Sequence, residues 1–318
     1  MEHGLGPPPL HSSPPIQLPR SRTNQLSLQQ VTATMQLTNP FRCNTTVPVA
    51  VLVLAATAAL ADGLLCNKSD KAALLAIKSA LGNNPGLSGW NSTMSCCAWT
   101  GITCNATGRV TDLTVFALDI SAPVPAAITN LTALQSVNLA YNQLYGSIPE
   151  FLGPQALPDL TFIRLDGNQL SGAIPPTATV DSLLLVGNNL TGPLPATFAD
   201  AEFSDLGLSD NQLTGDASML FGAKKKMNLL RLSRNRFAFD LGRVELPETI
   251  IGLEIDDNMI YGSIPAAAAG RNWIRFNVSY NNLCGPIPQG PYTKRFGSKH
   301  FVHNKCLCGR PLAPCSHV

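Results

Sequence analysis

Apolar residues recur in one short pattern along most of the chain. In LGLSDNQLTG, LRLSRNRFAF and LEIDDNMIYG, apolar residues stand five and three positions before an asparagine and two positions after it. The residues between them change freely. Alternation of this kind predicts a short strand with one buried face and one exposed face. The chain is therefore predicted to contain many equivalent short strands.

The pattern repeats at intervals of about 20 to 26 residues, a period at which self-similarity indicates a leucine-rich repeat solenoid. Leu118 occupies the asparagine position one period before the first asparagine, so eight registers can be aligned. We predict a curved, right-handed α/β solenoid with a parallel sheet on its concave face and a cap at each end. The aligned asparagines are Asn142, Asn168, Asn188, Asn211, Asn235, Asn258 and Asn281.

The asparagine is expected to turn inward and to hydrogen-bond backbone groups at the bend, because an unsatisfied buried polar group costs about 1–3 kcal/mol. Leu118 cannot do this, so the first turn should be imperfect. Glycine and Ile/Leu-Pro follow each strand, as in YGSIPE, and favour short strands and 3₁₀ turns on the convex side. The short spacing from Asn168 to Asn188 predicts an abbreviated convex loop around Pro175 and Pro176. A full amphipathic helix pattern is found only at residues 70–81, before the first repeat.

Composition is consistent with a repeat protein and excludes several classes. The chain has 318 residues, 45% of them hydrophobic and 13% charged, with 25 Gly and 25 Pro, which argues against disorder and against long helices. The formal charge of +2 is too small to indicate nucleic-acid binding.

The N-terminal region is predicted to direct secretion. An apolar run at 47–61 follows Arg42 and ends in Ala-Leu-Ala, so residues 35–61 resemble a signal peptide. A transmembrane helix is the alternative, but the run is shorter than the ~20 residues that span a bilayer. Residues 1–34 are either a disordered extension or lie before the true start at Met35. The predicted domains are an N-terminal cap at 62–108, repeats at 109–290 and a C-terminal cap at 291–318.

Secretion favours disulfides for the eight cysteines of the mature chain. The alternative is a zinc site made by Cys306, Cys308 and Cys315 with His300, His303 or His317; the irregular spacing argues against it, and no metal or cofactor is predicted. The glycosylation sequons of the mature chain are Asn67, Asn91, Asn105, Asn130, Asn189 and Asn277.

Four stretches carry a family resemblance: LLCNKSDKAALLAIKSAL, GWNSTMSCCAWTGITC with Trp99, NVSYNNLCGPIP and HNKCLCGRPLAPC. With the GDAS sequence at 215–218, they resemble the plant polygalacturonase-inhibiting proteins over essentially all of the mature chain. The resemblance implies a monomeric, secreted protein of the plant cell wall that binds fungal endopolygalacturonases through its concave face in defence. It also implies the disulfides Cys66–Cys96, Cys97–Cys104, Cys284–Cys306 and Cys308–Cys315.

The chain departs from that family in its concave residues. Family members usually have ten repeats and often carry an acid four positions before the asparagine, whereas only Glu254 is acidic at that position here. Nearby acids, including Asp257, could form a shifted acidic patch. The residues expected to contact the enzyme are Tyr141, Phe162, Arg164, Asp166, Asp205, Asp210, Glu254 and Asp256. Tyr280 is another concave aromatic residue.

Two further expectations concern pectin and function. A weak pectin-binding surface is expected at Lys224, Lys225, Lys226, Arg231, Arg234 and Arg243, although the three lysines alone would be typical of a solvated loop. Catalysis is not predicted, because no catalytic motif is present and the adjacent Asp256 and Asp257 cannot straddle a glycosidic bond. The alternative function is a secreted ligand-binding or co-receptor module in developmental or immune signalling.

Overall fold

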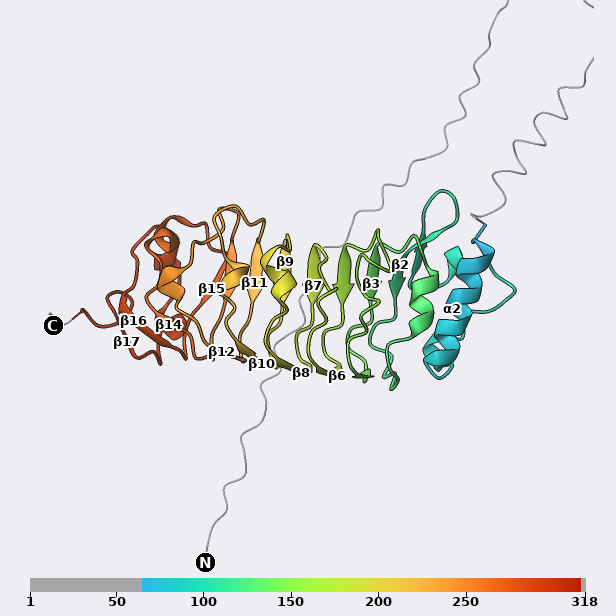
Figure 1. The fold of residues 1–318 in the computed structure, drawn as a ribbon, viewed down its shortest axis with the longest axis horizontal. Helices are drawn as coiled ribbons and strands as arrows, with labels where there is room; N and C mark the ends of the chain where they lie inside the picture. The colour runs from blue at the N-terminus through green and yellow to red at the C-terminus, as the bar shows by residue number, and fades with distance from the viewer. Residues whose placement is uncertain (1–64, 316–318) are drawn as a thin grey trace, which may run out of the picture. The chain divides into compact units, whose positions relative to one another are not determined.

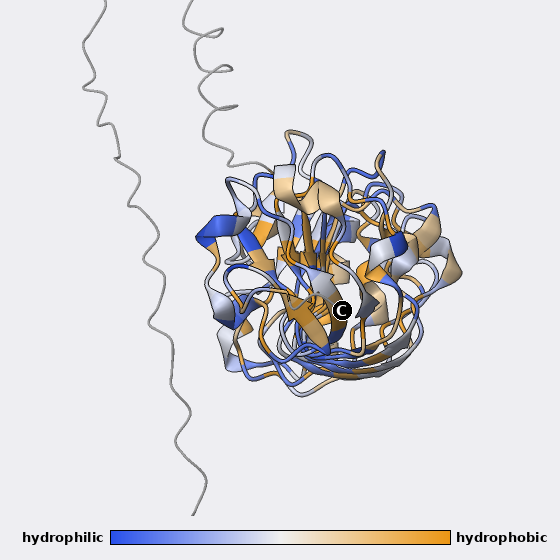
Figure 2. Cartoon of the chain, turned by 90° about the vertical axis from the view of Figure 1, so that its left-hand side faces the viewer, coloured by the Kyte–Doolittle hydropathy of each residue, from blue (hydrophilic) through white to orange (hydrophobic). Residues whose placement is uncertain are grey.

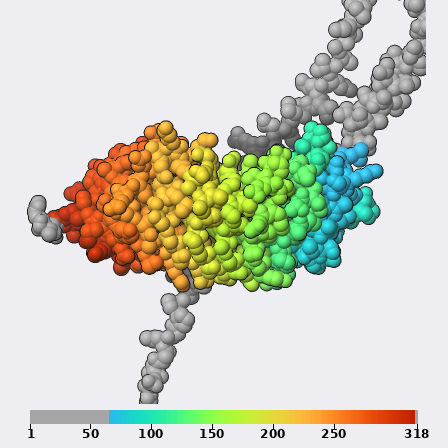
Figure 3. Space-filling model, viewed as in Figure 1, coloured from blue at the N-terminus to red at the C-terminus, as the bar shows by residue number. Residues whose placement is uncertain are grey.

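The computed structural model describes residues 65–315, so the predicted extension and signal peptide, together with His317, lie outside the described residues. Successive repeats stack in chain order along the molecule (Figures 1 and 3). One strand from each repeat joins a nine-stranded sheet, which confirms the predicted solenoid. The strands are β1 (Ile102–Cys104), β2 (Val110–Thr114), β3 (Ser136–Asn138), β5 (Phe162–Arg164), β7 (Ser182–Leu184), β9 (Asp205–Gly207), β11 (Leu229–Arg231), β13 (Gly252–Glu254) and β15 (Arg275–Asn277).

All neighbours in this sheet pair in parallel from β2 onward, and only β1, which belongs to the N-terminal cap, pairs antiparallel with β2. The parallel pairing follows from the repeat, because each unit enters the sheet in the same direction. The central residue of each strand from β3 onward is buried, whereas most flanking residues are partly exposed. The alternation predicted from the sequence is therefore the actual burial pattern.

The convex half of each repeat contains short strands and 3₁₀ turns, as predicted. A second sheet contains β4 (Tyr145–Gly146), β6 (Gln169–Gly172), β8 (Asn189–Gly192), β10 (Gln212–Gly215) and β12 (Arg236–Phe237). A third contains β14 (Tyr261–Gly262), β16 (Asn282–Pro286) and β17 (Cys306–Cys308). The 3₁₀ helices are η1 (Pro85–Leu87), η2 (Cys96–Ala98), η3 (Ala126–Asn130), η4 (Ala196–Ala199), η5 (Ser218–Leu220), η6 (Leu241–Arg243), η7 (Ala266–Gly270), η8 (Thr293–Arg295) and η9 (Ser298–His300).

Residues 173–181 form only turns between β6 and β7, which confirms the abbreviated loop around Pro175 and Pro176. The apolar residues of both sheets meet in one continuous core that runs the length of the repeats. Viewed from the C-terminal end, the hydrophobic segments gather inside the coil while polar segments follow the loops (Figure 2). The core thus runs along the axis of the stack, and the outward side chains of the sheet are left available for binding.

Buried asparagines connect each repeat to the one before it. Asn188, for example, is 7% exposed and donates from Nδ2 to the carbonyls of Leu165 and Leu185 at 3.0 and 3.1 Å, while its Oδ1 accepts from the Leu170 amide at 3.1 Å. This is the inward hydrogen bonding that the sequence predicted. Asn304 makes the same set of bonds with Leu283, Val278 and Phe301. The row of inward-turned asparagines, which we call the asparagine ladder, therefore continues one register beyond the eight aligned from the sequence.

The first turn, where Leu118 replaces asparagine, is completed by the N-terminal cap. Asn84 donates from Nδ2 to the Leu118 carbonyl at 2.9 Å, and the Leu118 amide donates to Asn142 Oδ1 at 3.0 Å. The predicted imperfection is therefore compensated by a side chain 34 residues earlier in the chain. Ala117 and Asp119 on either side adopt left-handed backbone conformations.

The N-terminal cap is closed by the helix α2 (Lys68–Ala80), which begins two residues before the predicted span because Asn67 caps it. Asn67 Oδ1 accepts from the amides of Ser69 and Asp70, as is typical of an N-cap. The fully buried Asp70 pairs with Arg109 at 2.9 Å, and this hydrogen bond raises the pKa of the Arg109 guanidinium.

The four disulfides join Cys66 to Cys96, Cys97 to Cys104, Cys284 to Cys306 and Cys308 to Cys315, the pairs that the family resemblance implied. They exclude the alternative zinc site, because Cys306, Cys308 and Cys315 have no free thiolate to offer a metal. The buried rings of Trp90 and Trp99 stack 5.7 Å apart inside the N-terminal cap, as core residues do. In the part of the chain that the structure describes, no helix has the length and apolarity needed to cross a membrane.

Candidate binding face on the parallel sheet

The outward side chains of the nine-stranded sheet form the concave face. Strand positions six and four residues before each ladder asparagine point outward, because the strands alternate between core and surface. The residue directly before the asparagine adopts a left-handed conformation in every register, with φ between 53° and 68°. Glycine fills this position twice, at Gly167 and Gly187, and the other side chains there stand out along the carboxyl edge of the sheet.

An aromatic cluster, defined here as Phe116, Tyr141 and Arg164, lies at the N-terminal end of this face. The rings of Phe116 and Tyr141 meet edge to face with centroids 5.4 Å apart, and they are 45% and 52% exposed. The Arg164 guanidinium lies 5.9 and 5.8 Å from the two ring centroids, within cation–π range. Two exposed aromatic rings beside a cation are the composition of an interface anchor.

Gly167 allows Tyr141 to lie where it does. A Cβ atom on Gly167 would come within 2.7 Å of the Tyr141 ring, closer than atoms in contact can approach. The ring therefore covers bare backbone in the next repeat. The rotation of Tyr141 is limited by this packing, which lowers the conformational entropy that it loses on binding a partner.

A charged trough occupies the C-terminal half of the face, with a cavity of about 290 Å³. Arginines and acids from neighbouring strands alternate across it: Arg231 pairs with Asp205 at 2.9 Å, Arg275 with Glu254 at 3.5 Å, and Arg234 with Asp210. The trough is lined by Val186, Ser209, Asp210, Arg231, Ser233, Arg234, Glu254, Asp256, Arg275 and Asn277.

Two arginines of the trough are set for polar recognition. The hydrogen bond with Asp210, reinforced by the charges of Asp210, Asp256 and Asp257, raises the pKa of the Arg234 guanidinium above its ordinary value, so it stays charged. The buried Nε atom of Arg231 has no hydrogen-bond partner among the described residues. The Nη2 atom of Arg231 donates to Asp205 Oδ1 at 2.9 Å, so the neighbouring strand holds this guanidinium in place.

The residues expected to contact an enzyme all belong to this face, but they differ in accessibility. Tyr141 is exposed, whereas Asp166 is only 7% exposed, accepts from the Val186 amide at 2.9 Å and pairs with Arg164. Asp256 accepts from the Ser233 hydroxyl at 2.5 Å. The expected acidic patch is interrupted by arginines, so the trough presents alternating charges instead of a uniform negative field.

The six residues expected to bind pectin fall into three separate settings. Arg231 and Arg234 belong to the trough, and Arg243 lies in η6 beside Asp240 at 3.2 Å. Lys224 to Lys226 precede β11, where Lys225 donates to the carbonyls of Ala199 and Ala201. Each of the three arginines is thus paired with an aspartate, and the predicted grouping does not form one surface of unpaired cations.

Sequence alignment missed three parts of the face. Phe116 stands two positions before Leu118, so extending the concave positions to the leucine register would have identified it. Arg275 stands six positions before Asn281 and could have been found in the same way. Tyr280 stacks on His303 with centroids 4.2 Å apart, and His303 belongs to a ninth register that lies beyond the eight aligned from the sequence.

A metal site is not supported by the side chains that the structure describes. The candidate group with metal-binding spacing there is Cys66, Cys96 and Cys97. All three cysteines are committed to disulfides, so they do not supply thiolate ligands.

Comparison with known proteins adds independent findings. The family model described as Leucine rich repeat N-terminal domain matches residues 67–105, and the one described as Leucine Rich Repeat matches residues 133–154. Polygalacturonase inhibitor 2 of Arabidopsis thaliana is 36% identical over 79% of this chain and 93% of its own length. Polygalacturonase inhibitor of Pyrus communis is 37% identical over 81% and 93%. The crystal structure of a plant ice-binding protein is 34% identical with a TM-score of 0.61, covering 79% of this chain and 98% of that one.

Proposed function

Because the chain belongs to the polygalacturonase-inhibitor family of plant leucine-rich repeat proteins, we propose that it binds and inhibits fungal endopolygalacturonases through its concave face. The chain acts by binding and is not itself an enzyme, as the names of its relatives indicate. Its place of action is the plant cell wall, which it reaches by secretion. It acts there as a monomer in defence.

The observation that carries this proposal is the arrangement of the concave face, where an exposed aromatic cluster and a charged trough share one sheet. Interfaces of high affinity combine a few aromatic and arginine anchors with charges that set orientation. Tyr141, Phe162 and Arg164 supply the anchors, and Asp205, Asp210, Glu254 and Asp256 supply the charges. Alternating charges select a partner with the complementary pattern and disfavour partners whose like charges would oppose them.

The experiment is an inhibition assay with the purified secreted protein and a panel of fungal endopolygalacturonases, with release of reducing sugar as the readout. Loss of activity with any enzyme of the panel supports the proposal. If no enzyme of a broad panel is inhibited or bound, the proposed function is wrong, and capture of a receptor ectodomain would then support the co-receptor alternative.

A matched pair of variants tests the face itself. Tyr141→Ala removes an anchor and should weaken binding by roughly tenfold or more, mainly through faster dissociation. Tyr261→Ala is the control, since Tyr261 is similarly exposed (49% against 52% for Tyr141) but lies in the third sheet. Equal effects of the two substitutions, or an effect of Tyr261→Ala alone, would contradict binding through the concave face.

Asn277 connects glycosylation to this proposal. It lines the trough and stands in the sequon Asn277-Val278-Ser279, so a glycan there would cover the C-terminal end of the face. We therefore expect the glycosylated protein to bind through the aromatic cluster and the central strands. Protein made with glycosylation should gain affinity when Asn277 is replaced by glutamine, whereas unglycosylated protein should change little.

A second candidate, ice binding, is favoured by the second sheet. Strands β6, β8 and β10 repeat a Gln or Asn, a buried Leu, a Ser or Thr and a Gly, and their polar side chains point outward at the ~4.8 Å spacing of neighbouring strands. A plant ice-binding protein is a structural relative. The test is whether the protein inhibits the recrystallisation of ice. Loss of this effect in the double variant Ser171→Lys with Thr191→Lys, with enzyme inhibition retained, would support this function. The absence of any effect on ice growth would reject it.

A further inference from the structure

Asp166 differs in accessibility from the other acids of the concave face. It is only 7% exposed, whereas Asp205, Asp210, Glu254 and Asp256 are all partly exposed. The sequence placed Asp166 among the residues expected to contact an enzyme, but an enclosed carboxylate offers little surface to a partner. An effect of Asp166 on binding therefore has to come through the groups that it holds in place.

Both carboxylate oxygens of Asp166 accept a hydrogen bond. Oδ1 accepts from the Val186 amide at 2.9 Å, and Oδ2 accepts from Arg164 Nε at 2.9 Å. The first bond fixes the carboxylate to the neighbouring repeat, and the second fixes the guanidinium to the carboxylate. Because a hydrogen bond between charged groups is roughly twice as strong as a neutral one, the Nε edge of Arg164 is firmly held.

The other edge of the Arg164 guanidinium remains available. The group lies 5.9 and 5.8 Å from the ring centroids of Phe116 and Tyr141, and the side chain is 33% exposed. Asp166 occupies Nε, while neither Nη atom forms a hydrogen bond within the described residues. Two open donors are thus presented beside two exposed rings, in an orientation that Asp166 sets.

The remaining arginines of the charged trough are engaged through their Nη atoms. Arg231 and Arg234 each donate from Nη2 to an aspartate, and Arg275 Nη1 lies 3.5 Å from the Glu254 carboxylate. Among the described arginines of the concave face, Arg164 alone keeps both Nη atoms open. A partner that bound to Arg164 would therefore not have to displace an internal acceptor from these atoms.

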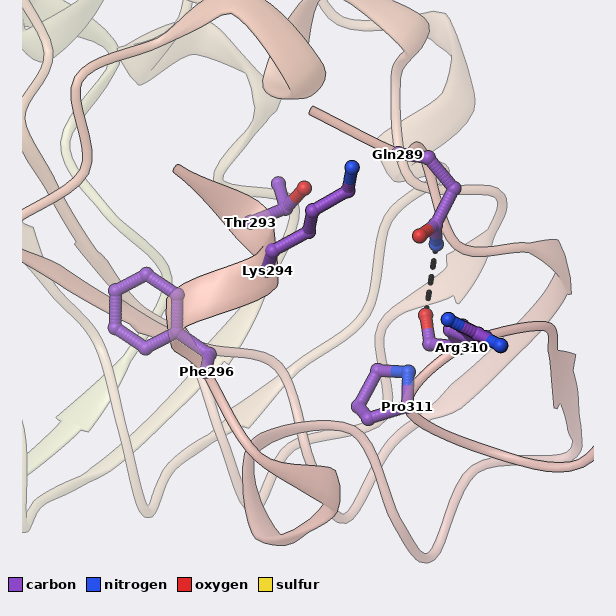
Figure 4. A pocket seen from close by; sticks show the side chains of 6 residues that line it. All are labelled: Gln289, Thr293, Lys294, Phe296, Arg310 and Pro311. Atoms are coloured by element: carbon purple, nitrogen blue, oxygen red, sulfur yellow. Dashed lines mark hydrogen bonds between the residues drawn. The ribbon is translucent and has the colours of Figure 1, made fainter. Parts of the chain in front are cut away.

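Cations without a supporting acid occur in the C-terminal cap. Figure 4 shows Lys294 and Arg310 at a cavity of about 500 Å³, where Gln289 Nε2 donates to the Arg310 carbonyl at 2.7 Å. Neither cation forms an ion pair within the described residues, so no acid fixes its charged end. Such side chains lose conformational freedom when they bind a ligand, whereas Arg164 has already lost much of it on folding.

We propose that Asp166 is a positioning residue of the concave face. It holds Arg164 against Phe116 and Tyr141, so that both Nη atoms face a hydrogen-bond acceptor on a bound protein. Because Asp166 neutralises the charge of Arg164, the acceptor that fits is a neutral oxygen such as a main-chain carbonyl, and a carboxylate would be repelled by Asp166. The inference rests on the proposed function, since it concerns a protein docked on this face.

The first measurement uses the free protein and needs no partner. In Asp166→Asn the amide oxygen still accepts from Val186, but the NH₂ group faces Arg164 Nε and cannot accept its proton. In nuclear magnetic resonance spectra, the Nε–H proton of Arg164 should exchange with water clearly faster in this variant, and the ring signals of Tyr141 should shift. Unchanged exchange and unchanged ring signals would overturn the inference and leave the proposed function standing.

The second measurement is the rate at which the protein dissociates from an endopolygalacturonase that the panel identifies. Asp166→Asn should raise this rate roughly fivefold or more. Asp240→Asn is the matched control, because Asp240 also accepts a backbone amide through Oδ1, at 2.9 Å, and pairs through Oδ2 with an arginine Nε, at 3.2 Å, but caps η6 outside the concave sheet. It should change the rate less than about twofold. Equal effects of the two substitutions would overturn the inference.

A double variant separates positioning from direct contact. In an Arg164→Gln background, Asp166→Asn should change the dissociation rate less than about twofold, because Asp166 then has no guanidinium to hold. A full effect in that background would mean that Asp166 contacts the partner itself, and the inference would be wrong. The loss caused by Arg164→Gln should be equal at low and high ionic strength, and a loss that shrinks with added salt would reject a neutral acceptor.

Failure of this inference and failure of the proposed function give different results. If the wild-type protein binds no enzyme of a broad panel, the proposed function is wrong, and the exchange measurement still decides whether Asp166 holds Arg164. If an enzyme is bound and Asp166→Asn dissociates at the wild-type rate, the proposed function stands and the positioning role is rejected.

Discussion

Replacing a central ladder asparagine gives a direct test of how the repeats are joined. In Asn188→Ala the Leu170 amide loses its acceptor, whereas the carbonyls of Leu165 and Leu185 keep a second donor, because Asn168 and Asn211 also donate to them at 3.0 and 2.9 Å. Only one buried group is therefore left unsatisfied. At about 1–3 kcal/mol for such a group, we expect the free energy of unfolding to fall by about 2 kcal/mol.

The measurement is equilibrium unfolding in urea with the disulfides intact, comparing midpoints at constant slope. Asn189→Ala is the matched control, since it removes the same atoms from the adjacent residue, whose side chain is exposed. It should change stability by less than about 0.5 kcal/mol. Equal destabilisation by the two substitutions would refute the reasoning.

Shared carbonyls also predict a specific coupling between registers. Asn168 and Asn188 both donate to the Leu165 carbonyl at 3.0 Å. The double variant Asn168→Ala with Asn188→Ala therefore removes both side-chain donors of this carbonyl, whereas each single variant leaves one of them. We expect the double loss to exceed the sum of the single losses by about 1 kcal/mol. Asn168 and Asn211 share no acceptor, so that pair should be additive. Additivity in the first pair would contradict the shared ladder.

Three further outcomes are expected. Gly167→Ala should push the Tyr141 ring aside and weaken enzyme binding, and the left-handed backbone at this position should also lower stability by about 1 kcal/mol. A binding assay and an unfolding curve measure the two effects separately, and unchanged binding would mean that the ring position is irrelevant. Replacing both Cys66 and Cys96 with serine opens a loop of 30 residues and should lower stability by about 3–4 kcal/mol in urea unfolding, more than removal of the seven-residue link from Cys97 to Cys104. Burial lowers the pKa of His300, and the charge of Lys299 lowers it further. The unfolded chain therefore binds the proton more readily than the folded chain, so stability should decline as pH falls below about 6.5. Unfolding curves taken at several pH values should show that His300→Gln removes this part of the decline.

The repeat pattern alone determined most of the fold. Strand positions, the inward asparagine, the convex turns and the absence of a helix near Pro175 all followed from local spacing, since each is set by alternation over a few residues or by glycine and proline. The disulfide pairs followed from the family resemblance rather than from spacing. The start of α2 was missed by two residues because Asn67 caps the helix ahead of the first clearly periodic residue.

The composition of the binding surfaces was decided by the tertiary structure. Asp205 and Arg231 are 26 residues apart in the sequence and meet only because neighbouring strands align them, so a list of acidic positions could not show that arginines neutralise them. Asn84 completes the turn at Leu118 from 34 residues away. The cavity of the C-terminal cap likewise brings Gln289, Lys294 and Phe296 together with Arg310, from a later loop. A periodic sequence specifies which side chains leave the core, but their neighbours across the strands depend on the register between repeats, and that register sets both the charge pattern and the shape of each surface.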